Sequence, residues 1–133
     1  MNLMKAMIPV FFSLSLMLQG CVLLAVGAGA AAGVGTVAYI KGELQTTYAA
    51  SLDETWDASL EALKELNLRI VSTRKGEAEG EIEAKKVGED KVSVALSIAG
   101  PGTTLVKIRV GIFGDERESR AISKGIESKL RGK

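Results

Sequence analysis

The chain contains no histidine and a single cysteine, Cys21, among its 133 residues. The absence of histidine excludes His-dependent catalytic triads, His-ligated metal centres and His-based pH switches. One cysteine can form neither an intramolecular disulfide nor a Cys-cluster zinc site. Aromatic residues are few, at 5%, and 17 basic residues are balanced by 16 acidic ones. The resulting net charge of +1 argues against a dedicated nucleic-acid-binding protein, which normally has a basic excess.

Charged residues are also nearly missing from the first 40 positions, where Lys5 is the only one. An uncharged apolar run extends from Ile8 to Leu18. It has the length of the hydrophobic region of a signal peptide and falls short of the roughly 20 residues that a membrane span needs. Residues 1–20 are therefore predicted to be a signal peptide.

The apolar run ends at Leu18-Gln19-Gly20-Cys21, which resembles a bacterial lipobox. In that motif a small residue such as Gly20 lets the peptide bond enter the protease site, and the cysteine thiol receives a diacylglyceryl group. The resemblance implies cleavage between Gly20 and Cys21, which leaves lipidated Cys21 as the membrane anchor, held stably by two or more acyl chains. Val22 stands where an Asp tends to retain enteric lipoproteins in the inner membrane. The analogy therefore favours the outer membrane, with the domain facing the periplasm.

Two other interpretations of the N-terminus stay open. Cys21 could be a small buried side chain, which is a common environment for a free cysteine. An uncleaved chain could instead form a two-helix membrane hairpin over residues 6–40, because its apolar character continues to Ile40.

Residues 21–35, the expected lipid anchor and membrane-proximal segment, are rich in glycine and alanine. Small residues four apart lie on one helix face and allow two helices to approach closely in lipid. In water each glycine would cost a helix about 1 kcal/mol. We expect a membrane-embedded or self-associating helix or hairpin; a flexible spacer and an apolar strand or helix docked on the folded domain are the alternatives. The helix-packing positions are Gly27, Gly29, Ala31, Gly33 and Gly35.

Residues 36–133 are predicted to fold as one domain of α+β class. Ser51 and Glu54 match a capping box that starts a helix, Asn67 suits a helix end, and Trp56 lies on an apolar helix face that is expected in the core. Asp115 is expected to cap a second helix. Segments of alternating polarity separated by short turns are typical of an antiparallel meander. The predicted elements are strands over 39–49, 68–74, 78–87, 91–99 and 103–113, and helices over 52–66 and from 116 onward.

This order, β-α-β-β-β-β-α, predicts a two-layer sandwich in which two helices cover one face of an antiparallel sheet of about five strands. In the first strand Ile40, Leu44, Thr46 and Tyr48 are expected to share one face. In the last helix Gly125 is expected to weaken a narrow apolar stripe.

No group of residues has the spacing of a catalytic or metal site, and no cofactor is expected. Asp115, Glu116 and Glu118 resemble a carboxylate cluster that could bind Ca²⁺, but helix capping and the helix dipole explain them. The glycines of the N-terminal segment have the wrong spacing for a dinucleotide-binding loop, and no βαβ unit surrounds them. Alternate glutamates over 77–83 are most simply a solvated sheet face.

Three segments, residues 35–43, 51–68 and 110–130, resemble a family of small bacterial cell-envelope lipoproteins known only as a domain of unknown function. The stretch from Gly114-Asp115 to Ser119 is the most distinctive. The resemblance implies no activity, so no functional residue is transferred. The S-L-D-x-x-W start of the first helix and the strand after it are also similar to helix-grip repeats in the lipoprotein of the outer-membrane barrel-assembly machine, which is an analogy of fold alone.

These observations favour a non-enzymatic envelope protein that is anchored in the membrane through Cys21. Its domain is expected to bind another envelope protein through the wet sheet face, a sheet edge or a groove between helix and sheet, and self-association through the glycine rows is a further hypothesis. The alternative is a carrier or sensor of a small apolar ligand held in the helix–sheet groove. A weaker alternative, an enzyme, would need a carboxyl group with a strongly shifted pKa inside a cleft.

Overall fold

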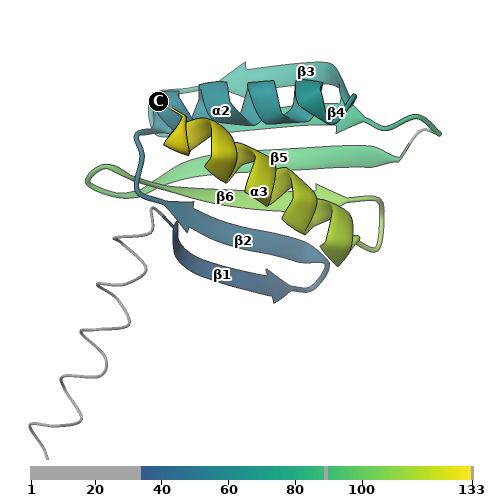
Figure 1. The fold of residues 1–133 in the computed structure, drawn as a ribbon, viewed down its shortest axis with the longest axis horizontal. Coiled ribbons are helices and arrows are strands. Elements are labelled where there is room, and N and C mark those ends of the chain that lie inside the picture. The colour runs from purple at the N-terminus through teal and green to yellow at the C-terminus, as the bar shows by residue number, and fades with distance from the viewer. Residues whose placement is uncertain (1–33, 89, 133) are drawn as a thin grey trace, which may run out of the picture. The chain divides into compact units, whose positions relative to one another are not determined.

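The structure, a computed structural model, describes residues 34–88 and 90–132 (Figure 1). Six strands form one antiparallel sheet in the order β1-β2-β6-β5-β4-β3. The expected signal and anchor positions Gly20, Cys21, Gly27, Gly29 and Gly33 lie outside the described residues. In chain order the elements are β1 (Val34–Ile40), β2 (Glu43–Tyr48), α2 (Leu52–Glu65), β3 (Arg69–Lys75), β4 (Glu79–Lys85), β5 (Lys91–Gly100), β6 (Thr103–Val110) and α3 (Glu116–Arg131).

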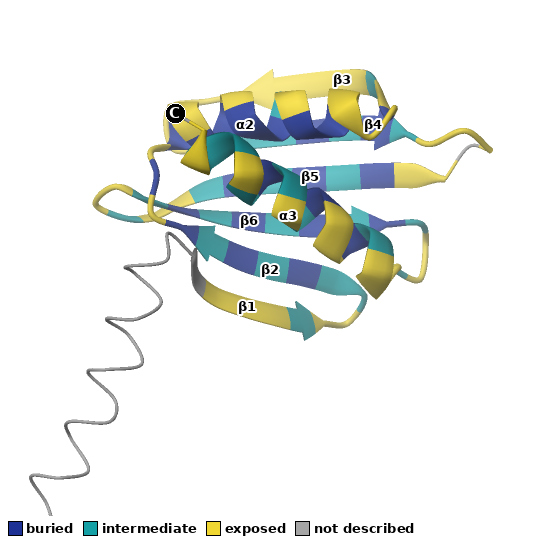
Figure 2. Ribbon diagram, viewed as in Figure 1, coloured by how far each residue is buried: buried dark blue, intermediate teal, exposed yellow. Residues whose placement is uncertain are grey.

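Both helices lie on the same face of this sheet, which confirms the predicted α+β two-layer architecture (Figure 1). Helix α2 contacts β3, β4 and β5, helix α3 contacts β2 and β6, and the two helices contact each other. Burial alternates along β2 and β6, where every second side chain points into the core (Figure 2). Trp56 and Leu63 of α2 and Ile126 of α3 meet the buried side chains of the sheet in one hydrophobic core, as predicted for Trp56.

The first predicted strand, 39–49, is wrong, because the chain turns back within it. Lys41 and Gly42 have φ values of 52° and 80°, so they form the two-residue turn of a hairpin between β1 and β2. The turn reverses which side chains of the predicted strand face the core. Ile40 therefore pairs with Glu43 and is 48% exposed, and it does not share the buried face of Leu44. The domain thus gains a sixth strand.

Gly35 also differs from its expected role. It lies within β1 and not in a helix, so the helix-packing row that was predicted to include it does not extend to this residue. The first described strand begins at Val34, two positions before the predicted start of the domain. An apolar strand that belongs to the folded domain was one of the alternatives for this segment.

The predicted helix boundaries are confirmed by their caps. The Ser51 hydroxyl accepts from the Glu54 amide at 3.2 Å, while the Glu54 carboxylate accepts from the Ser51 amide at 3.3 Å. Helix α2 ends just before Asn67, whose φ is 59° and whose amide donates to the Lys64 carbonyl. The Asp115 carboxylate accepts from the Glu118 amide at 3.0 Å at the start of α3.

Gly125 proves to be a packing residue. A Cβ atom at this position would lie 3.2 Å from Cβ of Ala62 on α2, which is closer than side chains normally pack. The small residue therefore lets α3 approach α2, and tertiary packing offsets the low helix propensity of glycine. No helix within the described ranges is long and apolar enough to cross a membrane.

Candidate functional site

The sheet face opposite the helices is the candidate site, because both described helices lie on the other face (Figure 1). Strand β5, which lies between β4 and β6, presents the small side chains of Ser93, Ala95 and Ser97 there, and Lys91 at its first residue. The strands on either side present longer, charged residues. A strip of small residues between two taller rows gives this face a lengthwise trough.

The strand register places opposite charges on the two sides of that trough. Lys107 of β6 pairs with Ala95 of β5, and Ala95 pairs with Glu81 of β4. Two residues further along β6, Arg109 pairs with Ser93, which pairs with Glu83. At these two positions the β4 side is therefore acidic and the β6 side basic, with Ala95 and Ser93 of β5 as the floor between them.

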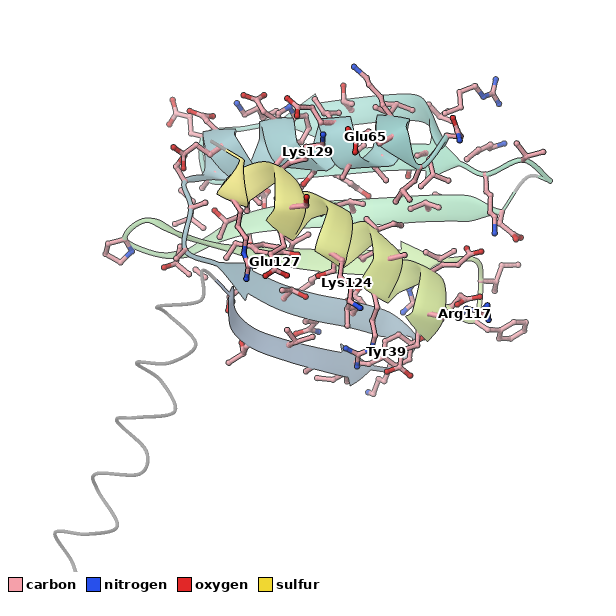
Figure 3. The ribbon with its side chains drawn as sticks, viewed as in Figure 1. Tyr39, Glu65, Arg117, Lys124, Glu127 and Lys129 are labelled. Carbon is pink, nitrogen blue, oxygen red and sulfur yellow. The ribbon has the colours of Figure 1, made fainter. Side chains whose placement is uncertain are left out.

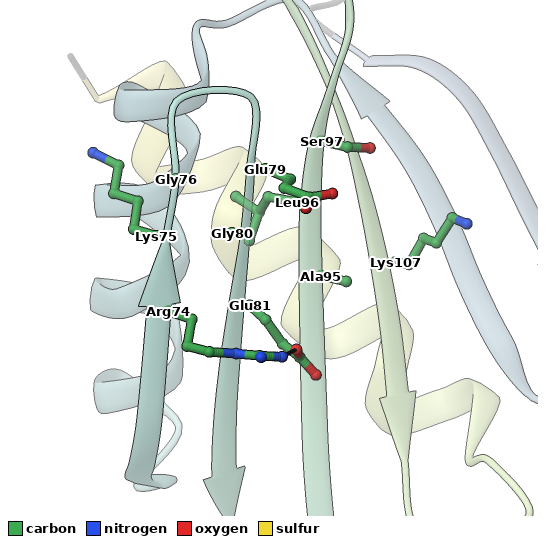
Figure 4. Close-up of a pocket in the computed structure, with 10 residues that line it drawn as sticks. All are labelled: Arg74, Lys75, Gly76, Glu79, Gly80, Glu81, Ala95, Leu96, Ser97 and Lys107. Carbon is green, nitrogen blue, oxygen red and sulfur yellow. Dashed lines mark hydrogen bonds and ion pairs between the residues drawn. The ribbon is translucent and has the colours of Figure 1, made fainter.

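The trough widens into two hollows. The first has a volume of about 490 Å³ and is lined by Glu79 and Glu81 of β4, Ala95 and Ser97 of β5, Lys107 of β6 and Arg74 of β3 (Figure 4). The second has a volume of about 510 Å³ and is lined by Asp90, Lys91, Ser93, Arg109, Gly111 and Ile112. Both hollows are open to solvent and mixed in charge, so they suit a polar, elongated ligand better than a small apolar one.

The acidic side of the trough is partly neutralised by its neighbours. Arg74 forms an ion pair with Glu81, and the two side chains point toward one another in Figure 4. This contact raises the pKa of Arg74 above its ordinary value. Lys91 pairs with Glu83 at 2.9 Å. Lys107, by contrast, is half-buried and has no ion-pair partner within the described part of the chain, which leaves its ammonium group available to a ligand.

The space between the helices and the sheet is filled. Tyr48, Leu63, Ile108 and Ile126 are each at most 1% exposed. A crevice at the edge of this layer, lined by Leu66, Leu68, Val92 and Ile122 among others, measures only about 160 Å³. Ligand pockets normally have volumes of about 300–1,000 Å³. This crevice is therefore too small for a typical small-molecule ligand.

A buried polar cluster links α3 to β2 on the covered face. The Tyr48 hydroxyl donates to the Ser123 carbonyl at 2.9 Å and lies 2.7 Å from the Ser123 hydroxyl, which is 3.3 Å from that of Thr46. Burial raises the pKa of Tyr48 to about 12. The cluster lies in the core and away from the trough, so its role is to hold α3 on the sheet.

The acidic residues at the start of α3 have structural roles, of which the sequence predicted the capping by Asp115. Asp115 caps the helix, Glu116 pairs with Arg120 at 2.8 Å, and Glu118 pairs with Lys86 of the β4–β5 turn. No group of three or more metal-ligating side chains occurs within residues 34–88 and 90–132. Figure 3 shows a similar pairing between the helices, where Lys129 of α3 reaches Glu65 of α2.

These features define a two-layer α+β domain with one face covered by helices and one open polar face. The chain belongs to the family of proteins of unknown function called DUF3568, whose family model matches residues 5–129. No curated protein matches the chain.

The trough itself was not predicted from the sequence, although its parts were visible there. The glutamates of β4 were predicted to be a solvated face, and Glu79, Glu81 and Glu83 do lie on the open face. The alternation of Ser93, Ala95 and Ser97 with apolar residues was also visible. Only the register shows that these small side chains lie between the glutamates and the basic residues of β6.

Proposed function

We propose that this protein is a lipid-anchored lipoprotein of the bacterial cell envelope and that its domain is a non-catalytic binding module. The observation that carries the proposal is the trough on the open sheet face, with its small-residue floor and oppositely charged sides. The ligand that fits it best is an extended segment of another envelope protein that carries both acidic and basic side chains. Such a segment would lie along β5, with its acidic groups toward Lys107 and its basic groups toward Glu79 and Glu81.

The filled core supports a binding module over the alternative carrier of a small apolar ligand. A carrier needs an internal cavity, and the crevice between helix and sheet is only about 160 Å³. Charged sides along an open surface favour recognition of a polar partner, because charge complementarity selects the partner and fixes its register.

Site-specific photocrosslinking in the envelope of the native host tests the trough. A photoreactive amino acid at Ala95 is expected to capture a partner protein, and the added substitution Lys107→Glu should weaken that capture. The matched control carries the probe at Glu61, which is exposed on α2. Lys124→Glu, a charge reversal on the exposed side of α3, controls for a general change in charge (Figure 3). Equal capture from Ala95 and Glu61, or no effect of Lys107→Glu, would overturn the proposed face.

The anchor needs a separate test. The intact mass of the protein extracted from membranes of its native host is expected to fit a chain that begins at Cys21 and carries acyl groups. An unmodified chain that begins at Met1 would overturn the lipoprotein proposal. Replacement of Gly29 and Gly33 by Leu tests self-association, because an unchanged particle size in detergent would contradict packing through these glycines.

A further inference from the structure

The loop between β6 and α3, residues 111–114, exposes two large apolar side chains. Ile112 is 86% exposed and Phe113 is 92% exposed. Both were predicted to lie in a strand over 103–113, but β6 ends at Val110. Side chains this exposed bury almost no apolar surface, so they add little to the stability of the fold. Neighbouring exposed apolar side chains are instead typical of an interaction site.

This loop is braced by contacts that fix its backbone. The Arg109 guanidinium donates to the Ile112 carbonyl at 3.3 Å and to the Lys41 carbonyl at 3.0 Å, which joins the loop to the β1–β2 turn. Gly42 and Gly114 are in backbone contact, and a Cβ atom at Gly42 would lie 2.5 Å from the Phe113 carbonyl oxygen. The two exposed side chains therefore project from a loop whose backbone is held in place by these contacts.

Other exposed apolar residues lie at the same end of the sheet. Leu44 pairs with Ile108 and Lys85 pairs with Lys91, so the β1–β2 turn, the β4–β5 turn and the β6–α3 loop share one end. The β4–β5 turn contributes Val87, which is 91% exposed. The apolar side chains come from the end of β1, from the β4–β5 turn and from the β6–α3 loop. We call this set the apolar tip; its members are Ile40, Val87, Ile112 and Phe113.

Cations lie beside the apolar tip without ion-pair partners. Neither Lys41 nor Arg117 pairs with a carboxylate in the described part of the chain, and Figure 3 shows Arg117 at the start of α3. Of the nearby acids, Asp115, Glu116 and Glu118 are engaged by the α3 cap, Arg120 and Lys86, while Glu43 pairs with Ile40 at the start of β2 and Asp90 lies in the β4–β5 turn. Apolar side chains next to unengaged cations fit the boundary between acyl chains and anionic headgroups.

We propose that the apolar tip is a second membrane contact, which inserts Ile112 and Phe113 into an anionic bilayer surface while Lys41 and Arg117 meet its headgroups. A bilayer can accept exposed apolar side chains without a matching shape, whereas a protein partner would need a pocket for each of them. Arg109 is a positioning residue in this contact, because it holds the backbone that presents the two side chains. The contact goes beyond the proposed function, since it uses neither Cys21 nor the hollow around Ala95 and Lys107, although Arg109 and Ile112 also line the second hollow of the trough.

The test places a tryptophan at the apolar tip of the full-length chain. Phe113→Trp is made in a Trp56→Phe background, and Ile98→Trp in the same background is the matched control, because Ile98 is 52% exposed at the opposite end of the sheet. Each chain is reconstituted in phosphatidylethanolamine–phosphatidylglycerol vesicles, with and without lipids brominated on their acyl chains. Any membrane attachment by the N-terminal residues is the same in both chains, so only the position of the probe differs.

The tryptophan at position 113 is expected to emit at shorter wavelength on vesicle addition and to be quenched by the brominated lipids. The tryptophan at position 98 should instead stay accessible to acrylamide in the water. Lys41→Glu together with Arg117→Glu should reduce the quenching at position 113 when phosphatidylglycerol is present. Acrylamide access at position 113 equal to that at 98 would overturn the proposal. It would also be overturned by a blue shift without vesicles and an increase in particle size, which would identify a second copy as the occupant. Neither result bears on the photocrosslinking or mass tests.

Discussion

The indole ring of Trp56 lies directly on the backbone of Gly80. A Cβ atom at position 80 would be 2.6 Å from Cζ3 and 2.9 Å from Cε3 of the ring, so only glycine fits beneath it. Lys75 Nζ lies 5.9 Å from the ring centroid on the neighbouring strand, within the range of a cation–π contact. This packing sets how closely α2 approaches β4.

Gly80→Ala should therefore destabilise the domain. The added methyl group must displace the indole or the strand, and overpacking of this kind costs about 1–3 kcal/mol in the free energy of unfolding. Urea unfolding followed by tryptophan fluorescence measures the loss. Gly76→Ala is the control, because a Cβ atom there would lie 3.4 Å from the Glu79 carbonyl oxygen, at ordinary contact distance. Equal stability of the two variants would contradict the close contact.

Gly42→Ala tests the contact between the β1–β2 turn and the β6–α3 loop. Gly42 has a φ of 80°, and an added Cβ would also collide with the Phe113 carbonyl. Gly102 has a φ of 63°, and a Cβ added there would meet no atom within 4 Å, so Gly102→Ala carries only the backbone strain. We expect Gly42→Ala to lose about 1–3 kcal/mol more stability than Gly102→Ala in urea unfolding. A difference near zero would mean that the two loops are not in contact.

Tyr48 should make the stability fall at high pH. Its pKa is about 12 in the folded state and 10.0 when unperturbed, so the unfolded chain loses its proton first as the pH rises. Stability is then unaffected by Tyr48 below pH 10 and declines between pH 10 and 12, by roughly 2–3 kcal/mol at the upper end. Other groups titrate in this range, so the readout is the difference between the wild type and Tyr48→Phe across urea unfolding at several pH values. Parallel curves for the two chains would contradict the burial of the hydroxyl.

Ser119→Ala should stabilise the domain. The Ser119 hydroxyl is fully buried in α3 and has no hydrogen-bond partner in the described structure. The free energy lost by removing it from water is therefore not offset by a hydrogen bond. Its removal should raise the free energy of unfolding by about 1 kcal/mol. Ser59→Ala is the matched control on α2, because the Ser59 hydroxyl donates to the Thr55 carbonyl at 2.7 Å and this bond would be lost. Thermal unfolding should rank Ser119→Ala above Ser59→Ala, and the reverse order would show that the Ser119 hydroxyl is satisfied.

The parts of the fold that could be predicted depend on local signals. Residues close together in the sequence determine the caps at Ser51 and Asp115 and the helix end at Asn67. All three are present in the structure. The hairpin at Lys41 and Gly42 was missed because Lys is an unusual residue at positive φ, so the turn had no strong sequence signal. The candidate site was predictable only in its residue types, because the trough depends on which strands are neighbours.

The sequence by itself determined the fold class, the caps of both helices and the alternation that separates the covered face from the open one. Those properties follow from residues that are near one another in the chain. Only the tertiary structure decided that β6 lies between β2 and β5, which sets Lys107 across from Glu81. It also decided that Arg109 of β6 reaches the Lys41 carbonyl, 68 residues away. Strand order and loop contacts arise from packing between distant segments, and no local pattern encodes them.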